Sequence, residues 1–345
     1  MEKRKFESNT TDSKALVVKR PKTDEIKGRE LIAAGVPRTS SLIAPIVVLE
    51  GHQAEVYTCK FDPSGKSLAS AGFDKRIFLW QVQEECANYH VFDGHKNAVQ
   101  EIHWSTDGER LFSASADKTV MAWDTVVGVR VKKLNEHTSF VNSCCPSKKG
   151  NLLVSGSDDK AVKLWDLRRK RSAQTFNHKY QVTSVAISHN NDQVYFGGID
   201  GTVHVWDLRR DDLAFSVNSH KDIITSIQLS PDGNFLLSNA MDNSLHVHDM
   251  RPYIPGDNRL TKVFTGAVHG FDQNLLKVNW SPDGSRVSAG SADRLVYIWD
   301  SVTRQVIYKL PGHTGTVNEV AFHPDEPIIA SCSSDKKIYL GEIEP

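Results

Sequence analysis

The chain has 345 residues, of which 39% are hydrophobic and 24% charged, so it is long enough to bury a sizeable core. Its 42 basic residues balance 42 acidic residues, which argues against a surface coated in positive charge for nucleic acid. No stretch approaches the roughly 20 consecutive apolar residues of a membrane span, the N-terminus lacks an apolar signal-peptide core, and the five cysteines include no C-x-x-C pair. We therefore expect a protein of a reducing compartment, with no membrane partner, no disulfide framework and no zinc knuckle.

Residues 1–41 form a tail whose composition differs from the rest of the chain. Residues 1–40 hold ten Lys or Arg, six Asp or Glu and a single aromatic residue, Phe6. Such a segment cannot bury enough apolar surface to offset the entropy of ordering it, so we predict disorder. Two basic clusters in the tail are typical of nuclear import signals or nucleic-acid contacts, and a merely solvated tail is the alternative. The clusters consist of Lys3, Arg4, Lys5, Lys19, Arg20 and Lys22.

From residue 42 to residue 345 the chain repeats one unit seven times. Each unit contains a histidine and an aspartate, which follows it by 22 residues in six units and by 24 in the sixth. In five units a tryptophan stands six residues after the aspartate. The aspartate recurs every 41–43 residues, except for one step of 51 that includes a Pro- and Gly-bearing insertion around 251–260. A fixed period of this length is the signature of a repeat architecture.

The first unit predicts four short strands, and the other units follow it. Residues 56–61, 67–71 and 76–80 alternate with period two and are separated by turns at 62–65 and 73–75. A fourth strand at 89–92 precedes the next histidine. Nothing between these segments is long enough, or has the right period, for a helix. The sequence therefore predicts an all-β fold.

Gly-His and Trp-Asp dipeptides recur at the ends of these units and resemble those of the WD-repeat β-propeller family. They are Gly51-His52, Gly94-His95, Gly312-His313, Trp123-Asp124, Trp165-Asp166, Trp206-Asp207 and Trp299-Asp300. The resemblance implies a seven-bladed β-propeller around a central channel, closed by a blade that both chain ends share. It predicts 46–49 as the outer strand of the last blade, whose three inner strands come from Val317–Gly341.

A His, a Ser, an Asp and a Trp recur together in the first three units and could suggest nucleophilic catalysis. An active site is rarely built three times in one chain, and the family resemblance implies a structural hydrogen-bond network instead. These predicted tetrads are His52, Ser70, Asp74 and Trp80; His95, Ser113, Asp117 and Trp123; and His137, Ser155, Asp159 and Trp165. Phe196 and Ala289 replace the serine in units four and six, and His248 and Gly341 replace the tryptophan in units five and seven. Because the histidines stand one per unit rather than in clusters, we predict no metal site, no catalytic residue and no cofactor.

A propeller without catalysis presents two faces for partners. Turn and inner-strand positions at the channel mouth carry aromatic and other large side chains, which suggests a protein-binding hot spot, although several could pack inward. These candidates are Tyr57, Phe73, Phe140, Asn142, Tyr180, Ile199 and Met241. The opposite face collects a basic patch that could meet phosphate or an acidic protein, or could simply be solvated. Its candidates are Lys148, Lys149, Arg168, Arg169, Lys170, Arg171, Arg209 and Arg210.

Longer strings, such as LASAGFDKRIFLW at 68–80 and the whole of 308–343, closely resemble the WD-repeat subunits of the U5 small nuclear ribonucleoprotein. That resemblance implies a nuclear, non-catalytic docking scaffold of pre-mRNA splicing. Its partners would be the large core scaffold protein of the U5 particle and other spliceosomal proteins, with at most an indirect or backbone contact to RNA. No cofactor and no small-molecule substrate follow from it.

Three alternatives stay open at this point. A Trp-Asp-x-Arg box at 165–168 and at 206–209 is found in substrate receptors of cullin-RING ubiquitin ligases, but it arises easily within such repeats. A chromatin-associated adaptor that accepts a basic side chain in the channel would need an acidic mouth, for which Glu55 and Asp158 are the visible residues. An enzyme is the third alternative, and no catalytic motif supports it.

Overall fold

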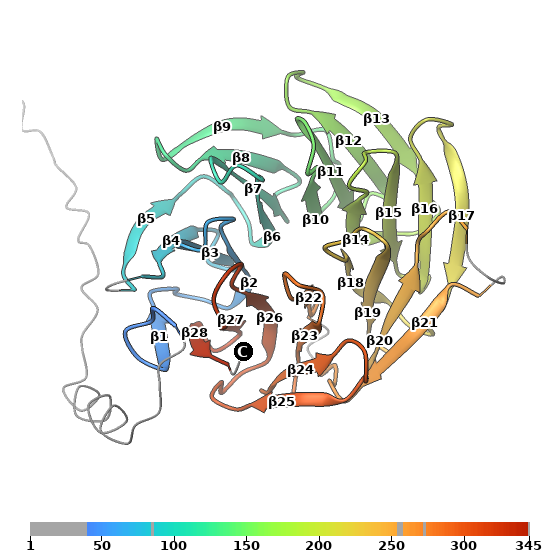
Figure 1. Ribbon diagram of the computed structural model, residues 1–345. Helices are drawn as coiled ribbons and strands as arrows, with labels where there is room; N and C mark the ends of the chain where they lie inside the picture. Colours follow the sequence, from blue (N-terminus) through green and yellow to red (C-terminus); the bar gives the residue numbers. More distant parts are fainter. Residues whose placement is uncertain (1–39, 84–85, 254–257, 272–273, 344–345) are drawn as a thin grey trace, which may run out of the picture.

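The computed structural model describes residues 40–83, 86–253, 258–271 and 274–343. In these residues the chain forms strands β1 to β28, which build seven four-stranded antiparallel sheets arranged as blades around a centre (Figure 1). The predicted all-β propeller of seven blades is therefore confirmed. The described residues include no helix long and apolar enough to cross a bilayer. The basic clusters of the tail lie outside the described residues, so the import signal remains a prediction.

Each repeat contributes its strands to one blade, numbered here as the repeats are. The strands of blade 1 are β2 (Val56–Phe61), β3 (Ser67–Gly72), β4 (Ile77–Gln81) and β5 (Asn88–Phe92). Those of blade 2 are β6 (Val99–Trp104), β7 (Arg110–Ser115), β8 (Val120–Asp124) and β9 (Val129–Leu134). Those of blade 3 are β10 (Val141–Pro146), β11 (Leu152–Ser157), β12 (Ala161–Asp166) and β13 (Ser172–Asn177). The strands predicted in the first repeat agree with β2 to β5 within one residue at each end.

The remaining blades follow the same order, from the channel outward. Blade 4 consists of β14 (Val182–Ile187), β15 (Gln193–Gly198), β16 (Thr202–Asp207) and β17 (Asp212–Asn218). Blade 5 consists of β18 (Ile224–Leu229), β19 (Phe235–Ala240), β20 (Ser244–Asp249) and β21 (Leu260–Thr265). Blade 6 consists of β22 (Val278–Trp280), β23 (Arg286–Gly290), β24 (Val296–Asp300) and β25 (Val306–Leu310). Blade 7 consists of β26 (Val317–Phe322), β27 (Ile328–Ser333), β28 (Lys337–Glu342) and β1 (Ile46–Glu50).

The two ends of the described chain close the ring as predicted. β1 pairs antiparallel with β28, with Val47 opposite Leu340, and so supplies the outer strand of the last blade. Leu42 and Leu49 are buried in the core that this blade shares with blade 1. Closure in this way gives β28 a second strand neighbour and ties the two ends of the described chain into one blade.

The hydrophobic core lies between blades rather than at the centre of the molecule. The cluster that holds Leu79 and Phe92 of blade 1 also holds Leu111 and Trp123 of blade 2. Trp80, Trp123, Trp165 and Trp299 are among the largest fully buried side chains. Because each core layer joins two neighbours, each blade is stabilised by the blade that follows it.

A β-bulge near the start of six inner strands places one extra residue at the channel mouth. The register skips one residue after Val56, Val99, Val141, Val182, Ile224 and Val317. The skipped residues are Tyr57, Gln100, Asn142, Thr183, Thr225 and Asn318. Bulges turn a side chain out of the normal alternation. Four of the six, Tyr57, Gln100, Asn142 and Asn318, line a hollow at the mouth. The other two, Thr183 and Thr225, are buried and donate to backbone carbonyls of the next blade.

Candidate docking faces and the networks that hold them

The histidine networks of blades 1 to 3 link each histidine with a serine, an aspartate and a tryptophan. In blade 1, His52 Nδ1 lies 2.6 Å from Asp74 Oδ2 and His52 Nε2 lies 2.7 Å from Ser70 Oγ. The indole N–H of Trp80 donates to the same Oγ at 2.8 Å. The consistent assignment is a chain in which the indole donates to the serine, the hydroxyl to Nε2, and Nδ1–H to the carboxylate. The same contacts recur at 2.6–2.9 Å in blades 2 and 3.

The aspartate of each network has a second task in the turn that follows it. Asp159 Oδ1 accepts the backbone N–H of Ala161 at 3.0 Å, while Oδ2 accepts from His137 and from the N–H of Thr138. The residue between, Lys160, has a φ of 67°. An L-residue adopts this left-handed conformation at a cost of about 1–2 kcal/mol. The carboxylate therefore holds both the tight turn and the histidine, and hydrogen bonds to both outweigh the effect of burial and lower the pKa of Asp159 to about 2.

Blade 4 departs from this pattern because Phe196 occupies the serine position. Asp200 Oδ2 is bonded at 2.8 Å by Nε2 of His204, and His178 Nε2 stands 3.5 Å from the same oxygen without hydrogen-bond geometry. The buried indole N–H of Trp206 also lacks a hydrogen-bond partner. In blade 6, Tyr297 Oη donates to Asp293 at 2.6 Å, and the Trp299 indole donates to a backbone carbonyl.

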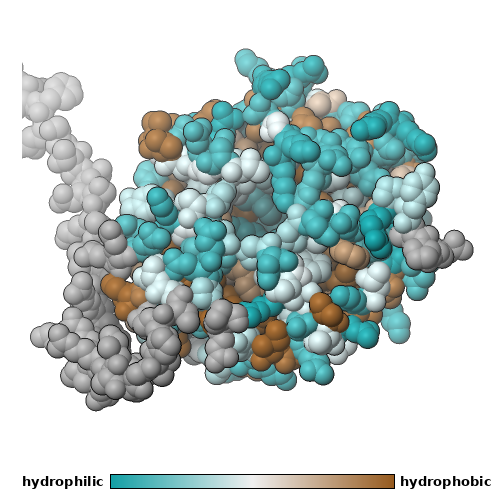
Figure 2. Space-filling view, in the orientation of Figure 1, coloured by the Kyte–Doolittle hydropathy of each residue, from teal (hydrophilic) through white to brown (hydrophobic). Residues whose placement is uncertain are grey.

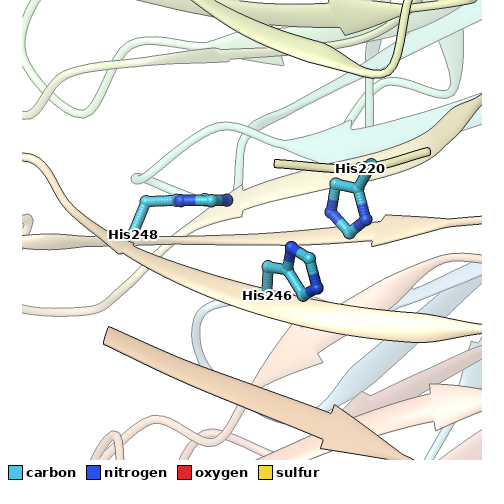
Figure 3. A group of neighbouring side chains, drawn as sticks. All are labelled: His220, His246 and His248. Carbon is cyan, nitrogen blue, oxygen red and sulfur yellow. The ribbon is translucent and has the colours of Figure 1, made fainter. Parts of the chain in front are cut away.

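Blade 5 keeps its His220–Ser238–Asp242 contacts but replaces the tryptophan with His248. His246 stacks on His220 with ring centroids 3.9 Å apart, and Figure 3 shows the three imidazoles together. Burial and the neighbouring imidazoles lower the pKa of His246 to about 4 and that of His248 to about 3. The prediction that the histidines do not cluster is therefore wrong for blades 4 and 5, because residues four and six positions after the aspartate face the same site as the repeat histidine.

The mouth face carries the residues proposed for protein contacts. The turn before each network aspartate lies beside the entry of its inner strand, because Phe73 N–H donates to Glu55 O and Asp158 N–H to Phe140 O. These turns therefore all meet at the channel mouth. Four of the candidate side chains there are 41–55% exposed: Phe73, Phe140, Tyr180 and Ile199. Tyr57 and Met241 are half-buried.

The structure corrects the prediction for Asn142. Asn142 is only 8% exposed, and its side-chain amide donates to Asp158 Oδ1 at 2.6 Å and to Val182 O at 3.0 Å. Asn318 makes the equivalent contact to Val56 O in the next blade at 2.7 Å. These amides tie one blade to the next. Asn142 also lines a polar hollow of about 220 Å³ at the mouth, together with Tyr57, Gln100, Asn274, Leu275 and Asn318.

The opposite face carries the basic patch. The links after β12 and β16 lie beside the turns after β10 and β14, because Leu167 N–H donates to Asn151 O and Leu208 N–H to Asp192 O. All eight predicted basic residues are exposed. Arg169 and Arg210 approach Asp166 and Asp207 only at 3.8–3.9 Å. Such exposed pairs contribute little, so the patch remains accessible.

Sequence reasoning missed a buried charge network beside the channel. Lys60 Nζ contacts Glu319 Oε1 at 2.5 Å, and Lys277 Nζ contacts Glu101 Oε1 at 3.1 Å. Burial disfavours the charged form of Glu319, but the two lysines outweigh it and lower its pKa. These pairs join blades 1, 2, 6 and 7. The available signal was the presence of charged residues within three inner strands, at Lys60, Glu101 and Glu319.

Figure 2 shows one face of the molecule, which is mostly hydrophilic, with scattered hydrophobic patches and a hollow at the centre.

Seven segments of the chain match the family model described as WD domain, G-beta repeat. They are residues 43–81, 86–124, 128–166, 170–207, 212–249, 259–300 and 304–340.

Several known proteins resemble the chain over nearly its whole length. The U5 small nuclear ribonucleoprotein 40 kDa protein of Homo sapiens is 61% identical over 91% of this chain and 88% of that protein. The protein of the same name in Dictyostelium discoideum is 54% identical over 92% of this chain and 90% of that protein. Pre-mRNA-splicing factor cwf17 of Schizosaccharomyces pombe is 43% identical over 99% of this chain and 100% of that protein.

Proposed function

Because the chain belongs to the WD-repeat family, we propose that it is a non-catalytic docking subunit of the nuclear pre-mRNA splicing machinery and a component of the U5 particle. The names of its relatives in three distant organisms support the splicing role. The absence of catalysis is supported by the burial of the network serines, because Ser70, Ser113 and Ser155 have no exposed surface through which a substrate could reach them.

The observation that carries the docking role is the aromatic group on the mouth face. Phe73, Phe140 and Tyr180 remain exposed around a ring that is otherwise well packed. Exposed aromatic side chains of this kind dominate the binding energy of protein interfaces. We assign this face to the large core scaffold protein of the U5 particle. The basic face would meet an acidic protein surface or an RNA backbone.

The Trp-Asp-x-Arg boxes are explained by the fold itself. Trp165 is fully buried, and Asp166 Oδ1 accepts the backbone N–H of Arg168 at 2.9 Å. In blade 4, Asp207 accepts Arg209 N–H in the same way. These motifs therefore shape the turn after the third strand of a blade, and nothing in them favours a ubiquitin-ligase partner.

A pull-down comparison tests the proposed face. Tagged wild-type chain and Phe140→Ala with Tyr180→Ala are purified from nuclear extract, with and without ribonuclease, and their partners are identified by mass spectrometry. We expect the large scaffold protein to survive ribonuclease with the wild type. Two interface aromatics at about 1–2 kcal/mol each should lower its recovery at least ~10-fold in the variant.

Val126→Ala with Val127→Ala is the matched control, because these side chains are 80% and 68% exposed but lie in the turn after Asp124, on the other face. Equal recovery with both double variants would show that the mouth face is not the docking site. Recovery that disappears with ribonuclease would make the contact RNA-mediated. Ubiquitin-ligase subunits in place of splicing proteins would overturn the splicing role.

A further inference from the structure

Two groups of metal-ligating side chains converge in the described part of the chain, one in blade 4 and one in blade 5. The blade 5 group, drawn in Figure 3, is His220, His246 and His248. The rings of His220 and His246 are nearly parallel, with an interplanar angle of 13° at 3.9 Å. A metal ion must lie in the plane of each imidazole that binds it, so stacked rings cannot share one ion.

The blade 4 group, His178, Asp200 and His204, has a different geometry. His178 enters from the link before β14, Asp200 from the β15–β16 turn and His204 from β16. Both Nε2 atoms approach the same carboxylate oxygen, at 3.5 Å and 2.8 Å. The two ring planes meet at 53°, so one point can lie in both planes.

One of these nitrogens has no hydrogen-bond partner. His178 Nε2 is buried and makes no hydrogen bond, and Phe196 stands where blades 1 to 3 place the serine that bonds the repeat histidine. A buried polar atom without a partner costs about 1–3 kcal/mol. His204 is better placed, since its Nδ1 is held at 2.8 Å by Ser216 Oγ. Such an outer contact orients the ring, as in many metal sites, and leaves Nε2, which meets Asp200 Oδ2 at 2.8 Å in this structure, as the nitrogen that would bind an ion.

The separations fit a tetrahedral ion of the zinc class. Zinc binds imidazole nitrogen and carboxylate oxygen at about 2.0–2.2 Å, which places two tetrahedral ligand atoms roughly 3.3 Å apart. The observed 2.8 and 3.5 Å bracket this value, so small side-chain rotations would admit the ion. The three side chains are 20%, 14% and 10% exposed, which leaves one side of the site open for a water as fourth ligand.

We propose that His178, Asp200 and His204 form a binding site for one Zn²⁺ ion at the mouth face of blade 4. The ion joins the entry of the inner strand, the turn and the third strand, which are three of the four segments that the complete network joins in blades 1 to 3. It links these three segments without the second strand, on which Phe196 replaces the serine. It also lies next to Tyr180, so it stabilises the surface around an exposed aromatic residue.

Metal binding by the full chain tests this inference. Chelator-treated protein is dialysed against micromolar Zn²⁺ and bound metal is measured by mass spectrometry, and Co²⁺ is used as a spectroscopic probe. We expect one equivalent of Zn²⁺ and a tetrahedral Co²⁺ spectrum without a thiolate charge-transfer band, because the site holds no cysteine. Excess Zn²⁺ should raise the melting temperature by mass action.

His204→Gln removes a ligand and keeps a polar side chain, and His246→Gln is its matched control at the corresponding position of blade 5. We expect His204→Gln to lose the equivalent and the thermal shift, while His246→Gln retains both. Ser216→Ala, which touches only the outer nitrogen, should weaken Zn²⁺ affinity about 10–100-fold. No bound metal in a folded wild type would overturn the proposal. So would binding that survives in His204→Gln or disappears equally in His246→Gln.

Discussion

Acidification should destabilise the propeller through the histidines of blade 5. His246 and His248 are 7% and 0% exposed, and their burial lowers the pKa of His246 to about 4 and that of His248 to about 3. An unfolded histidine has a pKa near 6.5. The unfolded chain therefore binds more protons below pH 6.5, and stability falls as the pH drops from about 6.5 toward the folded pKa values.

The size of the effect follows from these values. Between pH 7.5 and pH 5.0 each of these imidazoles lowers the free energy of unfolding by about 2 kcal/mol. The reason is that pH 5.0 lies about 1.5 units below the pKa of an unfolded histidine, and each unit corresponds to about 1.36 kcal/mol. Together the two histidines lower the free energy of unfolding by about 4 kcal/mol, which is a large part of the 5–15 kcal/mol by which an ordinary domain is stable.

Urea unfolding at pH 7.5 and pH 5.0, followed by circular dichroism, measures this loss. His248→Trp restores the residue found in blades 1 to 4 and should reduce the loss between the two pH values by about 2 kcal/mol. The reciprocal change Trp165→His in blade 3 should increase the loss. An equal loss of unfolding free energy in wild type and His248→Trp would refute the reasoning, whatever the absolute stability of the variant.

Three further outcomes are expected. Asp159→Ala removes a charge-assisted bond to His137 and two backbone contacts, so it should lower the free energy of unfolding by about 3–4 kcal/mol. Asp159→Asn can still accept the turn N–H and should cost less. Equal melting temperatures of Asp159→Ala and wild type would contradict the network's structural role. Backbone amides of blade 4 should exchange their hydrogens faster than those of blade 3, because the network of blade 4 lacks the serine and is incomplete. Slower exchange in blade 4 would contradict this expectation. Alanine at the basic residues of 19–22 should reduce nuclear accumulation of a fluorescent fusion, and unchanged accumulation would show that the tail is not the import signal.

Much of the fold could be predicted because its information is local and repeated. The period-two pattern at 56–61 and the turn after it recur in every blade, so errors in one repeat are corrected by the others. The pairing of 46–50 with 337–342 is long-range, and it was expected only because the resemblance to WD-repeat propellers implies a blade that both chain ends share.

The site was less predictable, because it depends on departures from that repeat. The bulge that turns Tyr57 and Asn142 out of the alternation leaves no mark in the hydrophobic pattern, so Asn142 was expected on the surface when it bridges two blades. The convergence of His178 and His204 depends on which residue stands at 196. A sequence pattern reveals the substitution at 196, but only the structure shows that His178 Nε2 lies buried without a hydrogen bond and close to the carboxylate that His204 contacts.

The departures are not scattered around the ring. Blades 1 to 3 carry complete networks, while blades 4 to 7 each carry a different replacement, at 196, 248, 289 and 341. Since every core layer is shared by two neighbours, four consecutive altered blades weaken one arc of the ring more than the same changes spread apart would. Local opening is least costly where buried polar groups are unsatisfied. The arc formed by blades 4 to 7 is therefore where a bound ion, a proton or a partner can change stability most, while the complete networks of blades 1 to 3 hold the rest of the ring.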